Sequence, residues 1–166
     1  MKISLSQSLN ENDLQHKGPK YDQREGIGAV PYNASIDYFG CKVWMKPSTF
    51  LYLALPLERK HADAVEYLKI QMLAGKPLGS PFMNIALDRV DGKLVAQNAK
   101  VTGHEGRNRM YAIQEIYGEI LVLVHLLFSG EVRARNLTDE LMNQLNRHLI
   151  PQGKTQSVQG PFWTNF

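Results

Sequence analysis

The spacing of apolar residues changes several times along the chain, and each change predicts a new element. In residues 41–45, Val43 and Met45 alternate with Lys42 and Trp44, which is typical of a short strand. Pro47 suits the first turn of a helix, and the apolar stripe that follows it ends at Pro56. A second helix is predicted over residues 58–74, because its apolar positions recur at helical spacing until Gly75.

The middle of the chain predicts a β-hairpin and then a loop. Residues 82–88 have the composition of a strand. The segment 90–96 that follows is predicted to turn at the Asp91-Gly92 dipeptide and to return as a second strand. Charged residues and glycines then interrupt the apolar pattern. We therefore expect a loop from Gly103 to Arg107.

The second half of the chain predicts a helix, a strand and a helix. A helix from about residue 108 to 117 carries its apolar residues on one face and ends at Gly118. The apolar run 120–127 is continuous, which indicates a strand buried on both faces, and His125 within it is expected to be a core residue. Thr138 is a good N-cap for the last helix. The apolar positions of that helix are Leu141, Met142, Leu145 and Leu149.

This order of elements predicts an α/β (α+β) protein, with a small mixed sheet and flanking helices. Residues 36–150 are expected to form a single domain. Residues 1–35 are polar and rich in turn signals, and predict an extended arm. Residues 151–166 predict a polar tail with an aromatic end, which either folds back onto the body or docks on another subunit.

Composition narrows the possible functions. The 166 residues suit one domain, and the net charge of +3 permits phosphate contacts without the dense basic patches of most DNA-binding domains. A single cysteine, Cys41, excludes an internal disulfide and a multi-cysteine zinc site. The five histidines lack metal-ligand spacing, so no metal site is expected.

The N-terminus lacks the apolar segment of a signal peptide and no run is long enough to cross a bilayer, which predicts a cytoplasmic protein without a membrane partner.

The stretch from Gly103 to Arg109 concentrates the residue types that bind phosphate. Backbone N–H groups at a helix start form an anion site, and glycines let a ligand approach them closely. The predicted binding residues are Gly103, Gly106, Arg107, Asn108 and Arg109, in which the arginines supply forked donors. His104 and Glu105 are the candidate acid/base residues. The alternative is an ordinary surface turn whose charges are solvated.

The sequence "DGKLVAQNAKVTGHEGRNRMYAIQEIYGEILVLVHLL" resembles the core of the ParB/sulfiredoxin superfamily. That core has a hairpin, a glycine-arginine turn opening a helix, and a hydrophobic strand. Gly106, Arg109 and Ala112 fall where the family has its glycine, second arginine and alanine. The resemblance implies binding of nucleotide phosphates at the turn, as for CTP in partition proteins and ATP in sulfiredoxin. Arg107 stands where sulfiredoxin carries its catalytic cysteine, so sulfiredoxin activity is not expected.

The resulting expectation is a ParB-like domain of phage or plasmid type. It would bind a nucleotide or nucleic-acid phosphate, with a nucleoside triphosphate and Mg²⁺ as the implied cofactor and hydrolysis or strand cleavage as the implied chemistry. Two alternatives remain. One is a structural protein of a phage virion or other assembly, in which arm and tail make homo-oligomer or partner contacts in the host cytoplasm or the virion. The other is a small DNA-binding accessory protein.

Overall fold

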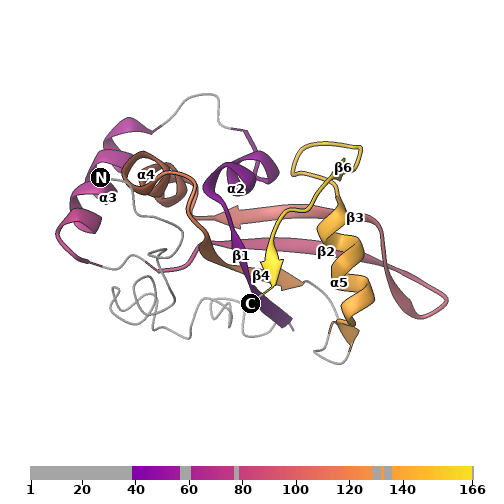
Figure 1. The fold of residues 1–166 in the computed structure, drawn as a ribbon. Helices are drawn as coiled ribbons and strands as arrows, with labels where there is room; N and C mark the ends of the chain where they lie inside the picture. Colours follow the sequence, from indigo (N-terminus) through magenta and orange to yellow (C-terminus); the bar gives the residue numbers. More distant parts are fainter. Residues whose placement is uncertain (1–38, 57–60, 77–78, 129–131, 133–135, 166) are drawn as a thin grey trace.

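A computed structural model describes residues 39–56, 61–76, 79–128, 132 and 136–165 of the chain. The predicted arm over residues 1–35, the start of the second predicted helix and Phe166 lie outside these residues. The described part contains four helices and seven strands (Figure 1). In chain order they are β1 (Phe39–Met45), α2 (Pro47–Leu53), α3 (Ala62–Leu73), β2 (Phe82–Val90), β3 (Lys93–Glu105), α4 (Arg107–Tyr117), β4 (Val122–Phe128), α5 (Asp139–Arg147), β5 (His148–Leu149), β6 (Val158–Gln159) and β7 (Thr164–Asn165).

The main sheet has five strands in the order β3-β2-β4-β1-β7, and β5 pairs separately with β6. β2 and β4 run parallel, whereas the other neighbours in the main sheet are antiparallel. β4 occupies the centre of the sheet, and all seven of its side chains are buried. The prediction of a strand buried on both faces is therefore confirmed, as is the α+β class with a mixed sheet and flanking helices.

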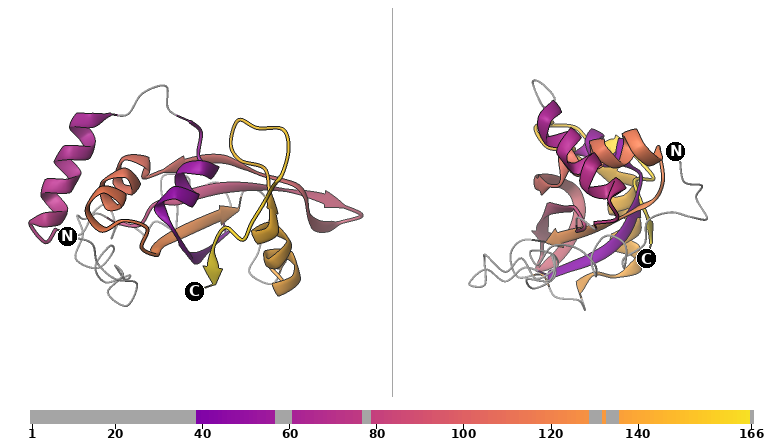
Figure 2. Two further views of the ribbon diagram at one scale, coloured as in Figure 1. Left: turned by 45° about the horizontal axis from the view of Figure 1, so that its top comes forward. Right: turned by 90° about the vertical axis from the view of Figure 1, so that its left-hand side faces the viewer.

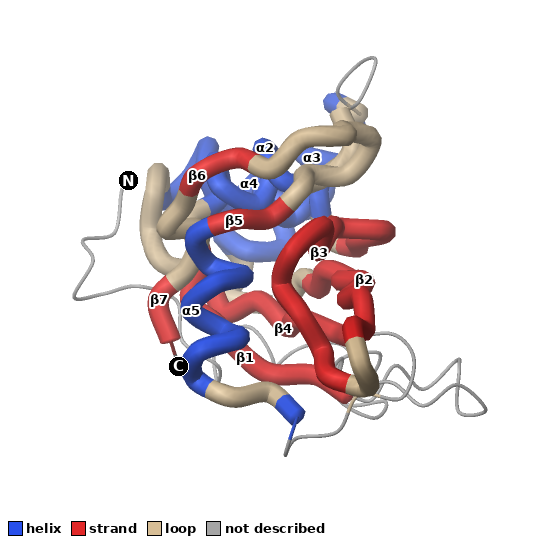
Figure 3. Tube along the Cα trace, turned by 90° about the vertical axis from the view of Figure 1, so that its right-hand side faces the viewer, coloured by secondary structure: helices blue, strands red, loops and turns tan. Residues whose placement is uncertain are grey.

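One hydrophobic core joins the sheet to the helices. It combines β-strand side chains such as Val124 with Phe50 of α2, Ile113 of α4 and Leu145 of α5. α3 packs on α4 and lies at the outer end of the molecule (Figure 2). Seen from the opposite end, α5 and the short β5–β6 ribbon lie in front of the sheet (Figure 3).

The β2–β3 hairpin turns at the predicted dipeptide. Asp91 has φ 51° and Gly92 has φ 78°, so both central residues are left-handed, as a two-residue hairpin turn requires. β3 is long, and it bulges opposite Ala86 and Asp88 of β2. The hairpin prediction is confirmed, and the position of β3 decides where the glycine-rich stretch lies.

Two boundary predictions are wrong. The loop expected from Gly103 is absent, because Gly103 pairs with Asn84 and the strand continues to Glu105, leaving Gly106 alone between β3 and α4. Leu149 does not belong to the last helix. α5 starts at Thr138 as its N-cap, as predicted, but the chain becomes extended at His148, and Leu149 pairs with Val158 in the β5–β6 ribbon.

Two of the C-terminal aromatic residues, Phe162 and Trp163, pack against their own chain. Phe162 and Trp163 are each 5% exposed and belong to the single core. Asn146 of α5 holds this segment: its Oδ1 accepts the backbone N–H groups of Phe162 at 2.7 Å and Trp163 at 2.8 Å. β7 then adds to the free edge of β1. The assembly role stays a prediction, but these two buried side chains no longer support it.

Candidate functional site

The candidate site is the junction where β3 ends and α4 begins. Gly106 joins them with φ 110° and ψ 14°, a left-handed conformation that side chains disfavour. A Cβ atom at Gly106 would lie 2.6 Å from Cβ of Pro81, the residue that precedes β2. The turn therefore requires glycine for two reasons, its backbone angles and its contact with Pro81.

The first turn of α4 has no side-chain cap, since Gly106 has no side chain to accept the helix's first N–H groups. The Gly106 carbonyl accepts the N–H of Met110, and that hydrogen bond begins the helix. The earlier N–H groups, which include those of Arg107 and Asn108, have no carbonyl of the helix to bind. They and the helix dipole form a partial positive charge at this end.

Arg109 lies in an internal ion pair. Its guanidinium is bonded to the carboxylate of Glu105, four residues earlier, and its side chain is 5% exposed whereas that of Glu105 is 49% exposed. Their predicted roles are phosphate binding for Arg109 and acid/base chemistry for Glu105. In the structure they bind each other and tie the end of β3 to α4.

The surroundings of Arg107 differ from those of Arg109. Its Nη2 atom is buried, and no group of the described residues hydrogen-bonds to it. Burial lowers the pKa of Arg107, and the nearby Tyr111 raises it. Oδ1 of Asn108 is also buried and has no hydrogen-bond partner among the described residues. Buried polar atoms without partners are rare and costly. An anion could accept a hydrogen bond from Nη2 of Arg107, whereas Oδ1 of Asn108 only accepts and needs a donor.

His104 is the last-but-one residue of β3 and is held by a residue far along the chain. Its Nδ1 lies 2.7 Å from Oε1 of Gln152, and the Gln152 amide nitrogen lies 3.4 Å from the Thr102 carbonyl. The amide nitrogen can only donate to that carbonyl, so Oε1 accepts and Nδ1 of His104 carries the proton. The ring of Phe50 meets the imidazole edge-on, with centroids 6.2 Å apart.

The electrostatic surroundings favour neutral His104. Burial lowers its pKa, the Gln152 hydrogen bond partly offsets this, and the charge of Arg107 lowers it further, with a small opposing contribution from Glu105. With Nδ1 protonated and the ring neutral, Nε2 keeps its lone pair. His104 is therefore arranged as a hydrogen-bond acceptor or general base, and a role as a cationic phosphate donor is disfavoured.

Gly103 has a packing role. Asn84 of β2 lies opposite it, and a Cβ atom at Gly103 would be 3.1 Å from the Asn84 amide nitrogen. Oδ1 of Asn84 is likewise buried without a hydrogen-bond partner among the described residues, as are the atoms named above in Arg107 and Asn108, and Nε1 of Trp163 near the C-terminus. Because glycine has no side chain, the Asn84 amide fits beside Gly103.

Sequence reasoning missed Pro81, Asn84 and Gln152. Pro81 and Asn84 belong to the segment predicted as a loop and strand, and Gln152 stands in a Pro-Gln-Gly turn with no recognisable motif. Only the Gly103-to-Asn84 pairing had a local signal, since a glycine inside a strand often marks a close approach of another group. The position of Gln152 depends on the tertiary fold.

Other reactive residues lie away from this junction. Burial raises the pKa of the Cys41 thiol to about 12, which leaves it unreactive. His125 is 4% exposed in the middle of β4, as expected of a core histidine. Within the described residues, no group of three or more His, Cys, Asp or Glu side chains could hold a metal ion. In the same residues no helix is both long and apolar enough to cross a membrane.

Searches of protein-family models, of curated proteins and of solved structures each found no match to this chain.

Proposed function

We propose that the protein binds the phosphates of a nucleotide or nucleic acid at the N-terminus of α4. The observation that carries the proposal is the buried Nη2 of Arg107, a donor with no partner among the described residues, beside an uncapped helix start. An anion there would pair the guanidinium and accept N–H groups of the first helical turn together. A fully solvated turn would leave Nη2 of Arg107 in water, whereas here that atom is buried although the residue as a whole is half-buried.

The order of elements around the junction supports the same proposal. A hairpin, a glycine turn, a helix and a hydrophobic strand follow one another, as in the ParB/sulfiredoxin core that the sequence resembles. β2 and β4 lie side by side and parallel. Pro81 and the turn at Gly106 meet at the start of β2. In the superfamily this turn binds nucleotide phosphates, and we assign the same role to Arg107 and the first turn of α4.

The residues at the junction fit phosphate better than they fit a metal ion. Glu105 is the nearest carboxylate, and Arg109 already occupies it. Mg²⁺ is usually held by carboxylates together with substrate phosphates, so here it would arrive with the nucleotide. If hydrolysis occurs, the group suited to accept a proton is Nε2 of His104, because Gln152 fixes its proton on Nδ1.

Isothermal titration calorimetry of the full chain tests the proposal with three probes: CTP, ATP and short duplex DNA. Arg107→Ala should weaken binding of the active probe by roughly 10- to 100-fold, the scale of a charge-assisted hydrogen bond. Arg147→Ala is the matched control, since Arg147 is an exposed arginine at the far end of α5. Equal affinity in wild type and Arg107→Ala, or no binding of any probe, would refute the phosphate site.

A further inference from the structure

α3 carries a row of large apolar side chains that face solvent. Tyr67 is 61% exposed, Ile70 is 59% exposed and Leu73 is 69% exposed. They are spaced three residues apart, so they adjoin one another along the helix surface. Three neighbouring exposed side chains of this size form a patch typical of an interaction surface, which we call the α3 stripe.

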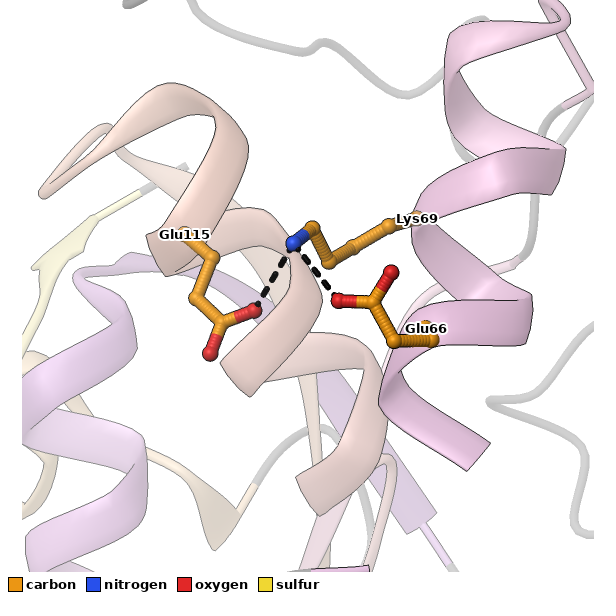
Figure 4. Close-up of polar contacts among 3 residues, drawn as sticks. All are labelled: Glu66, Lys69 and Glu115. Atoms are coloured by element: carbon orange, nitrogen blue, oxygen red, sulfur yellow. Dashed lines mark hydrogen bonds and ion pairs between the residues drawn. The ribbon is translucent and has the colours of Figure 1, made fainter. Parts of the chain in front are cut away.

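The inner face of α3 is occupied by α4. Val65 and Met72 of α3 are buried in the core, and Lys69 between them reaches across to Glu115 of α4 at 3.3 Å (Figure 4). Lys69 also bonds Glu66 on its own helix, and these hydrogen bonds with Glu66 and Glu115 raise its pKa. The α3 stripe is exposed to solvent, and α3 itself lies at the outer end of the molecule (Figures 1 and 2).

We propose that the α3 stripe binds the same stripe of a second copy of this chain, with the two helices antiparallel. A two-fold interface needs a surface that complements itself. The stripe has this property, because Tyr67 and Leu73 are each three residues from Ile70. In an antiparallel pair centred on Ile70, Tyr67 of each copy packs on Leu73 of the other, and the two Ile70 side chains meet on the axis.

The charges at the two ends of α3 favour the same arrangement. Asp63 is exposed in the first turn, and Lys76 is exposed just beyond the last turn. In an antiparallel pair centred on Ile70, Asp63 of one copy and Lys76 of the second copy lie at nearly the same height along the helix axis, about one residue apart. A parallel pair would instead place each charge beside its like. The antiparallel pairing therefore gains two ion pairs and opposed helix dipoles.

A single helix pair buries little surface compared with stable complexes, so the dimer is expected to be concentration-dependent. Sedimentation velocity of the full chain over a wide concentration series should show a monomer–dimer equilibrium. Ile70→Glu brings two carboxylates together on the axis and should raise the dissociation constant at least ~100-fold. Val90→Glu is the control, since Val90 is 54% exposed at the tip of the hairpin, and it should leave the equilibrium unchanged.

Charge reversal tests the antiparallel register. Asp63→Lys should weaken the dimer, and adding Lys76→Glu in the same chain should restore it, because the pair is then reversed rather than broken. Loss of dimer in both variants would contradict the register. A wild type that stays monomeric at every concentration, or a dimer unaffected by Ile70→Glu, would overturn the proposal.

Cross-linking gives a second readout that does not depend on affinity. Ile70→Cys should form a disulfide-linked dimer under mild oxidation, because the two introduced thiols meet on the axis. Tyr52→Cys is the matched control, as Tyr52 is 58% exposed on α2 and should remain unlinked. Equal cross-linking of both variants would indicate random collision and contradict the proposed interface.

Discussion

Oε1 of Gln152 lies 2.7 Å from Nδ1 of His104, although the two residues are 48 positions apart in the chain. The backbone of Gln152 is fixed as well, since its N–H donates to the Leu53 carbonyl at 2.9 Å. The loop after β5 therefore sets the tautomer of an imidazole at the end of β3. This contact leaves Nε2 of His104 as the acceptor atom of the ring, and the charge of Arg107 is close enough to lower the pKa of that ring.

The first prediction concerns the pKa of His104. NMR titration of its ring proton should give a value below the ordinary 6.5, because burial disfavours the charged imidazolium. Gln152→Leu should lower the pKa further by removing the hydrogen bond that offsets burial. Gln152→Glu should raise it, since a carboxylate stabilises imidazolium. The same pKa in all three proteins would show that Gln152 does not act on His104.

The lowered pKa also predicts how stability depends on pH. The unfolded chain takes up a proton on His104 at higher pH than the folded chain does, so the unfolded state binds more protons between the two values. This contribution to the free energy of unfolding is complete above about pH 6.5. It is lost as the pH falls through the folded pKa. As the pH is lowered, the free energy of unfolding measured with urea should fall less steeply in His104→Asn than in wild type.

Gly106 and Gly75 form a matched pair for testing the turn. Gly106→Ala should reduce the free energy of unfolding by at least about 2 kcal/mol, because strain at φ 110° adds to the overlap with Pro81. Gly75 has φ 77° but nothing within 4 Å of an added Cβ, so Gly75→Ala should cost only about 1 kcal/mol. Chemical denaturation measures both. Equal costs would mean that Pro81 moves aside easily.

Arg109→Ala should act on stability more than Arg107→Ala does. Removing Arg109 breaks an ion pair in which only the arginine is buried. The loss should be about 1.5–3 kcal/mol, limited because Glu105 is half-exposed and is rehydrated. Arg107→Ala removes a guanidinium with a buried, unpartnered Nη2, so it should be neutral or stabilising without ligand. Thermal denaturation of the two variants gives the comparison. If Arg107→Ala were the more destabilising of the two, Arg107 and not Arg109 would be the arginine whose contacts stabilise the fold.

Asn146 should be worth more to stability than a typical surface asparagine. Its side chain accepts two backbone N–H groups, from Phe162 and Trp163, and donates to the Trp163 carbonyl at 2.9 Å. Asn146→Ala should therefore cost about 2–3 kcal/mol and red-shift the Trp163 fluorescence as the tail loosens. Asn143→Ala, at an exposed position on the same helix, should cost less than about 0.5 kcal/mol.

Local sequence patterns determined most of the elements. Pro47 and the apolar spacing after it predicted α2, Asp91-Gly92 predicted the β2–β3 turn, and Thr138 predicted the start of α5. These signals act within a few residues, so the local sequence is enough to predict them. The continuous apolar run of β4 indicated a central strand for the same reason. The glycine-charge cluster also indicated a helix start at the candidate site, and α4 begins one residue before the position expected.

Only the tertiary structure decided what each residue of that cluster does. Arg107 and Arg109 look alike in sequence, yet Arg109 is paired with Glu105 whereas Arg107 buries an Nη2 atom that has no partner among the described residues. The helical period turns the two side chains to different surroundings. Gly103 became part of a strand through its long-range pairing with Asn84. Gln152 contacts His104 because the turn after β5 lies against the end of β3, where Gln152 also bonds the Thr102 carbonyl. Such contacts depend on packing between distant segments, which no local pattern in the sequence encodes.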